Sequence, residues 1–154
     1  MNQSIERGVL RTRIWLTGAS HLLDLGLRLY LAKVFFWSGL TKIGSWDDTL
    51  TLFQDEYRVP LLPPEVAAVL GTFGELFFPV LLALGLAGRF AAAGLFFVNL
   101  MAVVSYWHVL SAAAAALAQH WYWGSLLLVV ALHGPGKLSL DAIVWRRWLP
   151  GLSA

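Results

Sequence analysis

The chain has 154 residues, of which 58% are hydrophobic and only 13% charged, and its formal net charge is +2. A soluble domain carries about 25% charged residues, so this composition excludes an ordinary water-soluble protein and favours one whose solvent is lipid. The chain has no cysteine, which excludes a disulfide, a thiolate-held iron–sulfur cluster and thiol exchange. Any redox role would depend on a bound cofactor or a partner.

Residues 1–21 form a basic segment. Arg7, Arg11 and Arg13 alternate with apolar residues, which indicates a helix lying in the membrane interface. The alternative is a basic tail that only sets the orientation of the chain. The segment is not typical of a cleavable signal, because no long apolar core precedes a small-residue cleavage site.

Four apolar stretches follow and form a predicted membrane domain over 22–134. A spanning helix needs about 20 mostly apolar residues. The predicted spans are residues 22–44, 65–87, 90–109 and roughly 117–133. The fold class is therefore all-α, a bundle of four transmembrane helices. Pro79 lies inside the second span and should kink it.

Two further helices are predicted outside the spans. In the loop after the first span, Ser45 followed by Asp47 and Asp48 predicts a capped helix near 46–56 on the outer surface. At the other end, Gly and Pro residues stop the fourth span. Ser139 can cap a helix within residues 135–154, an amphipathic tail on the cytoplasmic surface.

The charges around the spans predict the topology. Basic residues concentrate in cytoplasmic loops. Three arginines precede the first span, Arg89 lies between the second and third, and Lys137 follows the fourth, whereas the loop over 45–63 carries four acidic residues. Both termini are therefore predicted to be cytoplasmic, which requires an even number of spans and agrees with four.

Charges inside the spans identify a candidate site. A charge at the bilayer centre costs roughly 2.5–3.5 kcal/mol on insertion scales, so each needs a partner or a function. Glu75 lies near the middle of the second span and can bond Lys33 or reach toward Lys42. Arg28 is the third possible partner, although it lies nearer the inner interface, where its side chain can snorkel. Glu75 is thus part of an ion pair locking two helices, a ligand-binding or proton-relaying group in the outer half, or a charge facing a partner subunit.

Polar residues of the third and fourth spans extend this hypothesis. Aromatic clusters near His108 and His120 are typical of an outer aromatic belt and place both histidines at the outer interface. There they can bond headgroups or water, or supply the polar end of a quinone site. Two histidines without a carboxylate in register predict no metal centre. The candidate ligand-binding residues are Arg28, Lys42, Glu75, Asn99, His108 and His120; no catalytic residue is assigned.

No nucleic-acid motif, P-loop, dinucleotide fingerprint or haem-attachment motif is visible. Several short motifs instead resemble the DoxX family of membrane proteins over about residues 22–141. They are Arg28, FFWSGLTK at 35–42, GE at 74–75, LGLAGR at 84–89, His108 and GPGKLSLD at 134–141.

The resemblance implies a multi-pass protein of the bacterial inner membrane, at most a subunit of a membrane oxidoreductase. It would be associated with a redox or detoxification system and would bind quinone or a small oxidisable molecule between helices. The alternative is a non-enzymatic scaffold that assembles a larger complex. The expected partners are the lipid bilayer and another protein or a second copy, not nucleic acid. A small transporter is disfavoured because no inverted repeat is visible.

Overall fold

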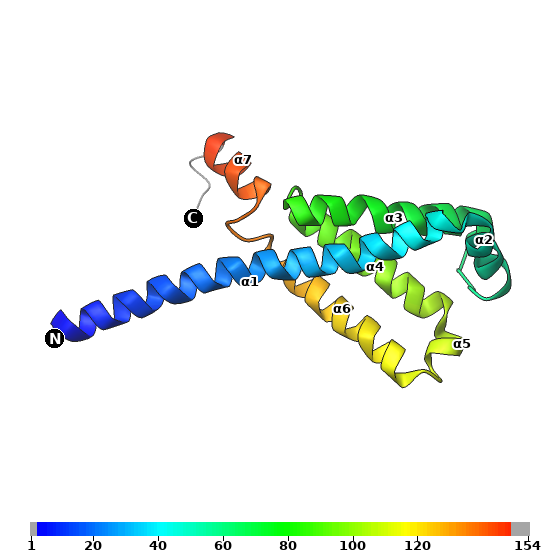
Figure 1. The fold of residues 1–154 in the computed structure, drawn as a ribbon, viewed down its shortest axis with the longest axis horizontal. Helices are drawn as coiled ribbons and strands as arrows, with labels where there is room; N and C mark the ends of the chain where they lie inside the picture. Colours follow the sequence, from blue (N-terminus) through cyan, green and yellow to red (C-terminus); the bar gives the residue numbers. More distant parts are fainter. Residues whose placement is uncertain (1–2, 149–154) are drawn as a thin grey trace.

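The computed structural model describes residues 3–148, and within this range helices are joined by short loops, with no strand (Figure 1). This confirms the predicted all-α class. In chain order the helices are α1 (Gln3–Gly44), α2 (Trp46–Asp55), α3 (Pro64–Leu84), α4 (Gly88–Ser105), α5 (Trp107–Leu110), α6 (Ala114–His133) and α7 (Leu140–Trp148).

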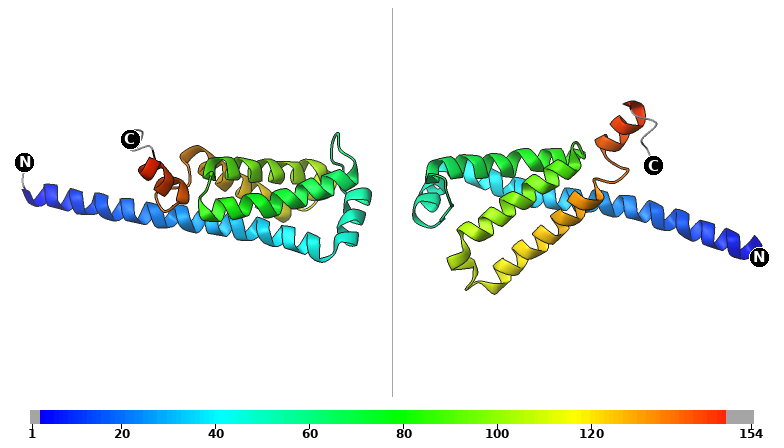
Figure 2. Two further views of the ribbon diagram at one scale, coloured as in Figure 1. Left: turned by 90° about the horizontal axis from the view of Figure 1, so that it is seen from above. Right: turned by 180° about the vertical axis from the view of Figure 1, so that it is seen from behind.

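The long helices alternate in direction. α1 and α4 run one way through the bundle, and α3 and α6 return (Figures 1 and 2). α3 packs along both α1 and α4, and α4 packs along α6, whereas α1 and α6 touch each other much less. The start of α1 and helix α7 lie at one end of the bundle, the α7 end, and α2 lies at the other, the α2 end (Figure 2).

Three helices of the described chain are long and apolar enough to cross a membrane, namely α3, α4 and α6. They match the predicted second, third and fourth spans. The third ends earlier than predicted, because Tyr106 leaves helical geometry at φ −111° and ψ 18° and the short helix α5 follows. α1 is not among the three and carries four charged residues between positions 24 and 42.

α1 is one continuous helix of 42 residues. In its described part, the predicted interfacial segment is therefore the same helix as the predicted first span. The side chains of Arg7, Arg11 and Arg13, on which the interfacial prediction depends, lie outside the described part of the chain, as do residues 149–154 of the predicted C-terminal tail.

The main core lies where the four long helices meet toward the α7 end. It contains Leu31 and Phe35 of α1, Leu82 of α3, Ala91, Ala92 and Leu95 of α4, and Leu127 and Val130 of α6. In lipid the hydrophobic effect does not drive helices together, so close packing must do so. The paired alanines let α4 approach its neighbours closely.

A second cluster fastens α2 across the other end. Phe53 of α2 is buried against Ala67 and Ala68 of α3, and the Thr49 hydroxyl donates to the Lys42 carbonyl at 3.1 Å. The helix predicted over 46–56 is thus confirmed. The predicted side-chain cap is wrong, because Ser45 makes no such bond and instead its carbonyl accepts from the Thr49 N–H at 3.0 Å.

We expect Gly39→Ala to destabilise the bundle by about 1–3 kcal/mol, the usual cost of overpacking. A Cβ there would lie 2.8 Å from Leu76 Cγ and 3.2 Å from the Glu75 carbonyl carbon. At Gly26 on the same helix a Cβ would meet nothing within 4 Å, so Gly26→Ala should be neutral or stabilise by up to about 1 kcal/mol. Thermal unfolding in lipid nanodiscs compares the two; equal effects would contradict this close approach of α1 and α3.

Candidate ligand-binding site

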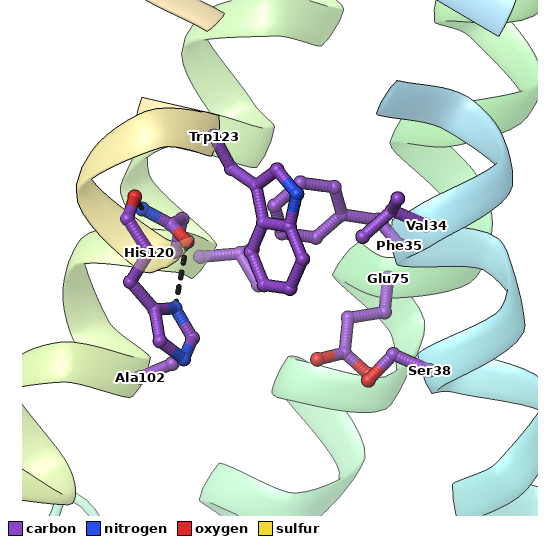
Figure 3. Close-up of a pocket in the computed structure, with 9 residues that line it drawn as sticks. Val34, Phe35, Ser38, Glu75, Ala102, His120 and Trp123 are labelled. Carbon is purple, nitrogen blue, oxygen red and sulfur yellow. Dashed lines mark hydrogen bonds between the residues drawn. The ribbon is translucent and has the colours of Figure 1, made fainter. Parts of the chain in front are cut away.

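A cavity of about 110 Å³ lies between α1, α3, α4 and α6 (Figure 3). Apolar and aromatic side chains make up most of its walls, and four polar residues complete them. The lining residues are Val34, Phe35, Ser38, Glu75, Val98, Asn99, Ala102, His120 and Trp123. A cavity of roughly 150 Å³ holds benzene, and each water occupies about 30 Å³. This cavity is smaller than the one that holds benzene, so it suits a few waters, and a ring requires its side-chain walls to move.

Glu75 and Lys42 form an ion pair at one side of the cavity. Lys42 Nζ lies 2.5 Å from Glu75 Oε2, and it also donates to the Ser38 hydroxyl, one turn earlier on α1, at 3.1 Å. The two charged side chains are only 16% and 11% exposed. Of the partners the sequence allowed, Glu75 therefore takes Lys42, while Lys33 is exposed on the other face of α1.

The backbone around Glu75 explains its placement. Gly39 lets α1 come close to the Glu75 backbone, and a Cβ on Gly74 would lie 2.8 Å from Val98 of α4. α1 and α4 therefore both approach α3 at this level. Pro79, one turn later inside α3, has no N–H to donate to the Glu75 carbonyl.

Asn99 and His120 form the second polar pair. Asn99 Nδ2 donates to the His120 carbonyl at 3.0 Å, and Asn99 Oδ1 lies 2.9 Å from His120 Nδ1. Because that oxygen can only accept, the arrangement places the imidazole proton on Nδ1. Nε2 makes no hydrogen bond with the described residues, so it is left as an acceptor. Figure 3 shows the imidazole and the Glu75 carboxylate on opposite sides of the cavity.

Trp123 spans the space between α6 and α1 (Figure 3). Its ring lies edge-on against His120, with centroids 5.3 Å apart, and against Phe35 at 5.9 Å. Its Nε1 donates to the Tyr30 hydroxyl of α1 at 3.2 Å. One indole therefore forms an aromatic wall of the cavity and connects two helices that otherwise touch little.

Tyr57 belongs to an aromatic stack at the α2 end. Its ring centroid lies 4.7 Å from that of Phe53 and 4.8 Å from that of Tyr106. Burial, and secondarily the Glu75 carboxylate, raises the pKa of Tyr57 to about 12. Tyr57 therefore stays neutral at physiological pH and adds no second negative charge near Glu75.

Arg28 does not line the cavity. It is 1% exposed at the α7 end, where Nη1 donates to the Leu82 and Ala83 carbonyls at 3.2 and 3.3 Å. Nη2 donates to the Leu138 carbonyl at 2.5 Å. The last carbonyls of a helix have no intrahelical donor and favour a cation, and α3 ends at Leu84. Arg28 therefore caps α3.

The GPGKLSLD segment, residues 134–141, fastens the same end of the bundle. The Asp141 carboxylate accepts from the Ala87 and Gly88 N–H groups at 2.8 Å each, at the start of α4, where an acid is favoured. The Ser139 hydroxyl accepts from the Ala142 N–H at 3.2 Å, which confirms its predicted cap of α7. The segment therefore holds helix ends together and does not line the cavity.

His108 and His120, both predicted to lie at the outer interface, occupy different environments in the structure. His108 lies on α5, is exposed and packs edge-on against Tyr106 with centroids 5.7 Å apart. Among the described residues, no three His, Cys, Asp or Glu side chains are grouped to hold a metal ion. Of the predicted residues, the structure brings together Lys42, Glu75, Asn99 and His120.

Sequence reasoning missed Ser38, Phe35 and Trp123 as site residues. Helical spacing could have identified two of them, because Ser38 lies four residues before Lys42 and Trp123 three residues after His120. Residues three or four apart share a helix face.

Comparison with known proteins covers the part of the chain that holds most of this site. A family model described as DoxX matches residues 23–109, which includes Lys42, Glu75 and Asn99. A protein of Haemophilus influenzae described as "Uncharacterized protein" is 32% identical over 127 residues, covering 77% of this chain and 80% of that protein. No solved structure matches the chain.

Proposed function

The chain belongs to the DoxX family of membrane proteins, and from that premise we propose that it is a subunit associated with a redox or detoxification system. We propose further that it binds the headgroup of a quinone, or a similar small oxidisable ring, between its helices. The observation that carries this proposal is the cavity of about 110 Å³, which four polar residues from four helices line together with aromatic side chains: Ser38, Glu75, Asn99 and His120.

In this proposal α1 crosses the bilayer together with α3, α4 and α6, and both termini lie on the cytoplasmic side of a bacterial inner membrane. The way α1 packs supports its role as a fourth span. It lies along α3, and two of its charged residues, Arg28 and Lys42, are compensated inside the bundle. Such compensation is what a charge in hydrocarbon requires. The basic residues near both ends support the orientation.

The hydrogen-bonding groups suit a ring with oxygens on opposite sides. On one side, the Ser38 hydroxyl, which lines the cavity, can donate to a quinone carbonyl. On the other side, His120 Nε2 can accept from the hydroxyl of a reduced ring. Trp123 and Phe35 supply the aromatic surfaces against which a flat ring packs. Asn99 holds the imidazole in the tautomer that leaves Nε2 free.

The second candidate is a non-enzymatic scaffold that assembles a larger complex with another protein or a second copy. One observation favours it: Lys42 and Glu75 bond each other directly at 2.5 Å, so the pair compensates itself without a guest molecule. A scaffold would co-purify with a stable partner, and Glu75→Gln would impair that assembly without changing any activity.

We expect His120→Phe to weaken binding of decylubiquinol, the reduced form, about tenfold, because the ligand hydroxyl loses its hydrogen bond to Nε2. His108→Phe is the matched control, since His108 is exposed and lies outside the cavity, and it should bind as the unmodified protein does. Binding is measured on purified protein in nanodiscs of native lipid. No quinone binding by the unmodified protein, or equal losses in both variants, would overturn the proposal.

A further inference from the structure

The seam between α1 and α6 differs from the other helix seams around the cavity. The α1–α3, α3–α4 and α4–α6 seams close on glycines, where an added Cβ would lie within 3.2 Å of the facing helix: Gly39 at Leu76, Gly74 at Val98 and Gly124 at Asn99. Among the described residues, no glycine makes such an approach between α1 and α6. These two helices diverge toward the N-terminal end of α6 (Figure 1), so only side chains close this seam.

One hydrogen bond holds those side chains together. Trp123 Nε1 of α6 donates to the Tyr30 hydroxyl of α1 at 3.2 Å, and Tyr122 lies edge-on against Tyr30 with centroids 6.5 Å apart. Tyr30 is 41% exposed. Val34 and Ser38 continue from Tyr30 along the same face of α1 and line the cavity. A stripe of α1 thus leads from the exposed Tyr30 to the polar pair.

We infer that the ligand carries an apolar tail and enters the cavity from the bilayer through the α1–α6 seam, with Trp123 as a gate held closed by Tyr30. This inference rests on the proposed function and adds the route and the tail. A cavity of about 110 Å³ has no room for a long chain, so a tail must leave the bundle. Because only side chains close the α1–α6 seam, the tail can pass through it by side-chain rotation, with no movement of either helix backbone. Side-chain rotation takes picoseconds to nanoseconds when unhindered, whereas helix displacement takes microseconds or longer.

Tyr30→Phe tests the gate, because it removes the acceptor hydroxyl and keeps the ring. We expect association and dissociation of decylubiquinone each to become about fivefold faster, from the net worth of one hydrogen bond, while Kd changes less than twofold. Tyr122→Phe is the matched control: it removes a hydroxyl from the neighbouring exposed ring, which bonds no described residue. The kinetics are measured by stopped flow on protein in nanodiscs.

A second arm tests the tail. The ring of ubiquinone without its chain should bind at least tenfold more weakly than decylubiquinone in the same nanodiscs, because it gains nothing from the seam. Two results would overturn the entry route through the seam: unchanged kinetics in Tyr30→Phe, or equal binding of both ring compounds. If His120→Phe still weakens binding of decylubiquinol, the proposed function stands. No binding of either compound by the unmodified protein would overturn both.

Discussion

Replacing Glu75 by leucine alone is expected to destabilise the folded protein by about 3 kcal/mol, and adding Lys42→Met in the same chain is expected to restore most of that loss. Removing one partner leaves an uncompensated buried charge, whereas replacing both by apolar residues is often neutral. The pair is well buried and bonded at 2.5 Å, so it meets the conditions for this effect. Thermal or denaturant unfolding in nanodiscs measures both variants.

The double variant also separates the two candidate functions. If the pair belongs to a ligand site, the restored protein folds but does not bind decylubiquinone. If it is only an ion pair locking two helices, the restored protein keeps whatever binding or assembly the unmodified protein has. Lys33→Met is the control on the same helix, because Lys33 is exposed, and it should change neither property. Failure of Lys42→Met to restore stability would contradict the pairing.

Arg28→Met is expected to destabilise the protein by about 3–5 kcal/mol. The guanidinium bonds the carbonyls of Leu82, Ala83 and Leu138. The Leu82 carbonyl keeps the Gly85 N–H as a donor at 3.1 Å, so the substitution leaves the other two carbonyls unsatisfied, and each such buried group costs about 1–3 kcal/mol. Because the Leu138 carbonyl is one of the three, limited proteolysis should also cut the chain before α7 more readily. Unfolding and proteolysis of the protein in nanodiscs measure these changes.

Arg89→Met is the matched control, since exposed Arg89 makes a single carbonyl bond at 3.4 Å, to His133. It should cost less than about 1 kcal/mol. Quinone affinity of the folded Arg28→Met protein should equal that of the unmodified protein, because Arg28 lies outside the cavity. A stable Arg28→Met protein that fails to bind would instead place Arg28 in the ligand site, as the sequence suggested.

Helix positions were predictable because they follow from local composition. Runs of about 20 apolar residues form helices in lipid regardless of their neighbours, and Ser139 caps α7 through a bond only three residues long. The end of the third span was less predictable. No proline or glycine marks the change at Tyr106, where the chain turns into α5 and the Arg58 N–H bonds the Ser105 carbonyl at 2.9 Å.

The roles of the buried charges were also only partly predictable from local sequence. Depth along the spans indicated that Glu75 needs a base from α1, and the sequence left Lys33, Lys42 and Arg28 as alternatives. Only packing could choose, since the rotation of each helix decides which base faces α3. Likewise, no sequence pattern distinguished the two histidines. In the structure His108 lies on α5 and packs against Tyr106, whereas His120 bonds Asn99 beside the cavity.

The sequence by itself determined that this is an all-helical chain suited to lipid, with long apolar helices and charges that need partners. It did so because hydrophobicity and helix length are local properties. The tertiary structure decided which charges meet: Lys42 bonds Glu75 beside a cavity, and Arg28 caps α3 far from it. Those outcomes depend on helix rotation and on glycine-mediated approach between segments distant in the chain, which no local pattern encodes.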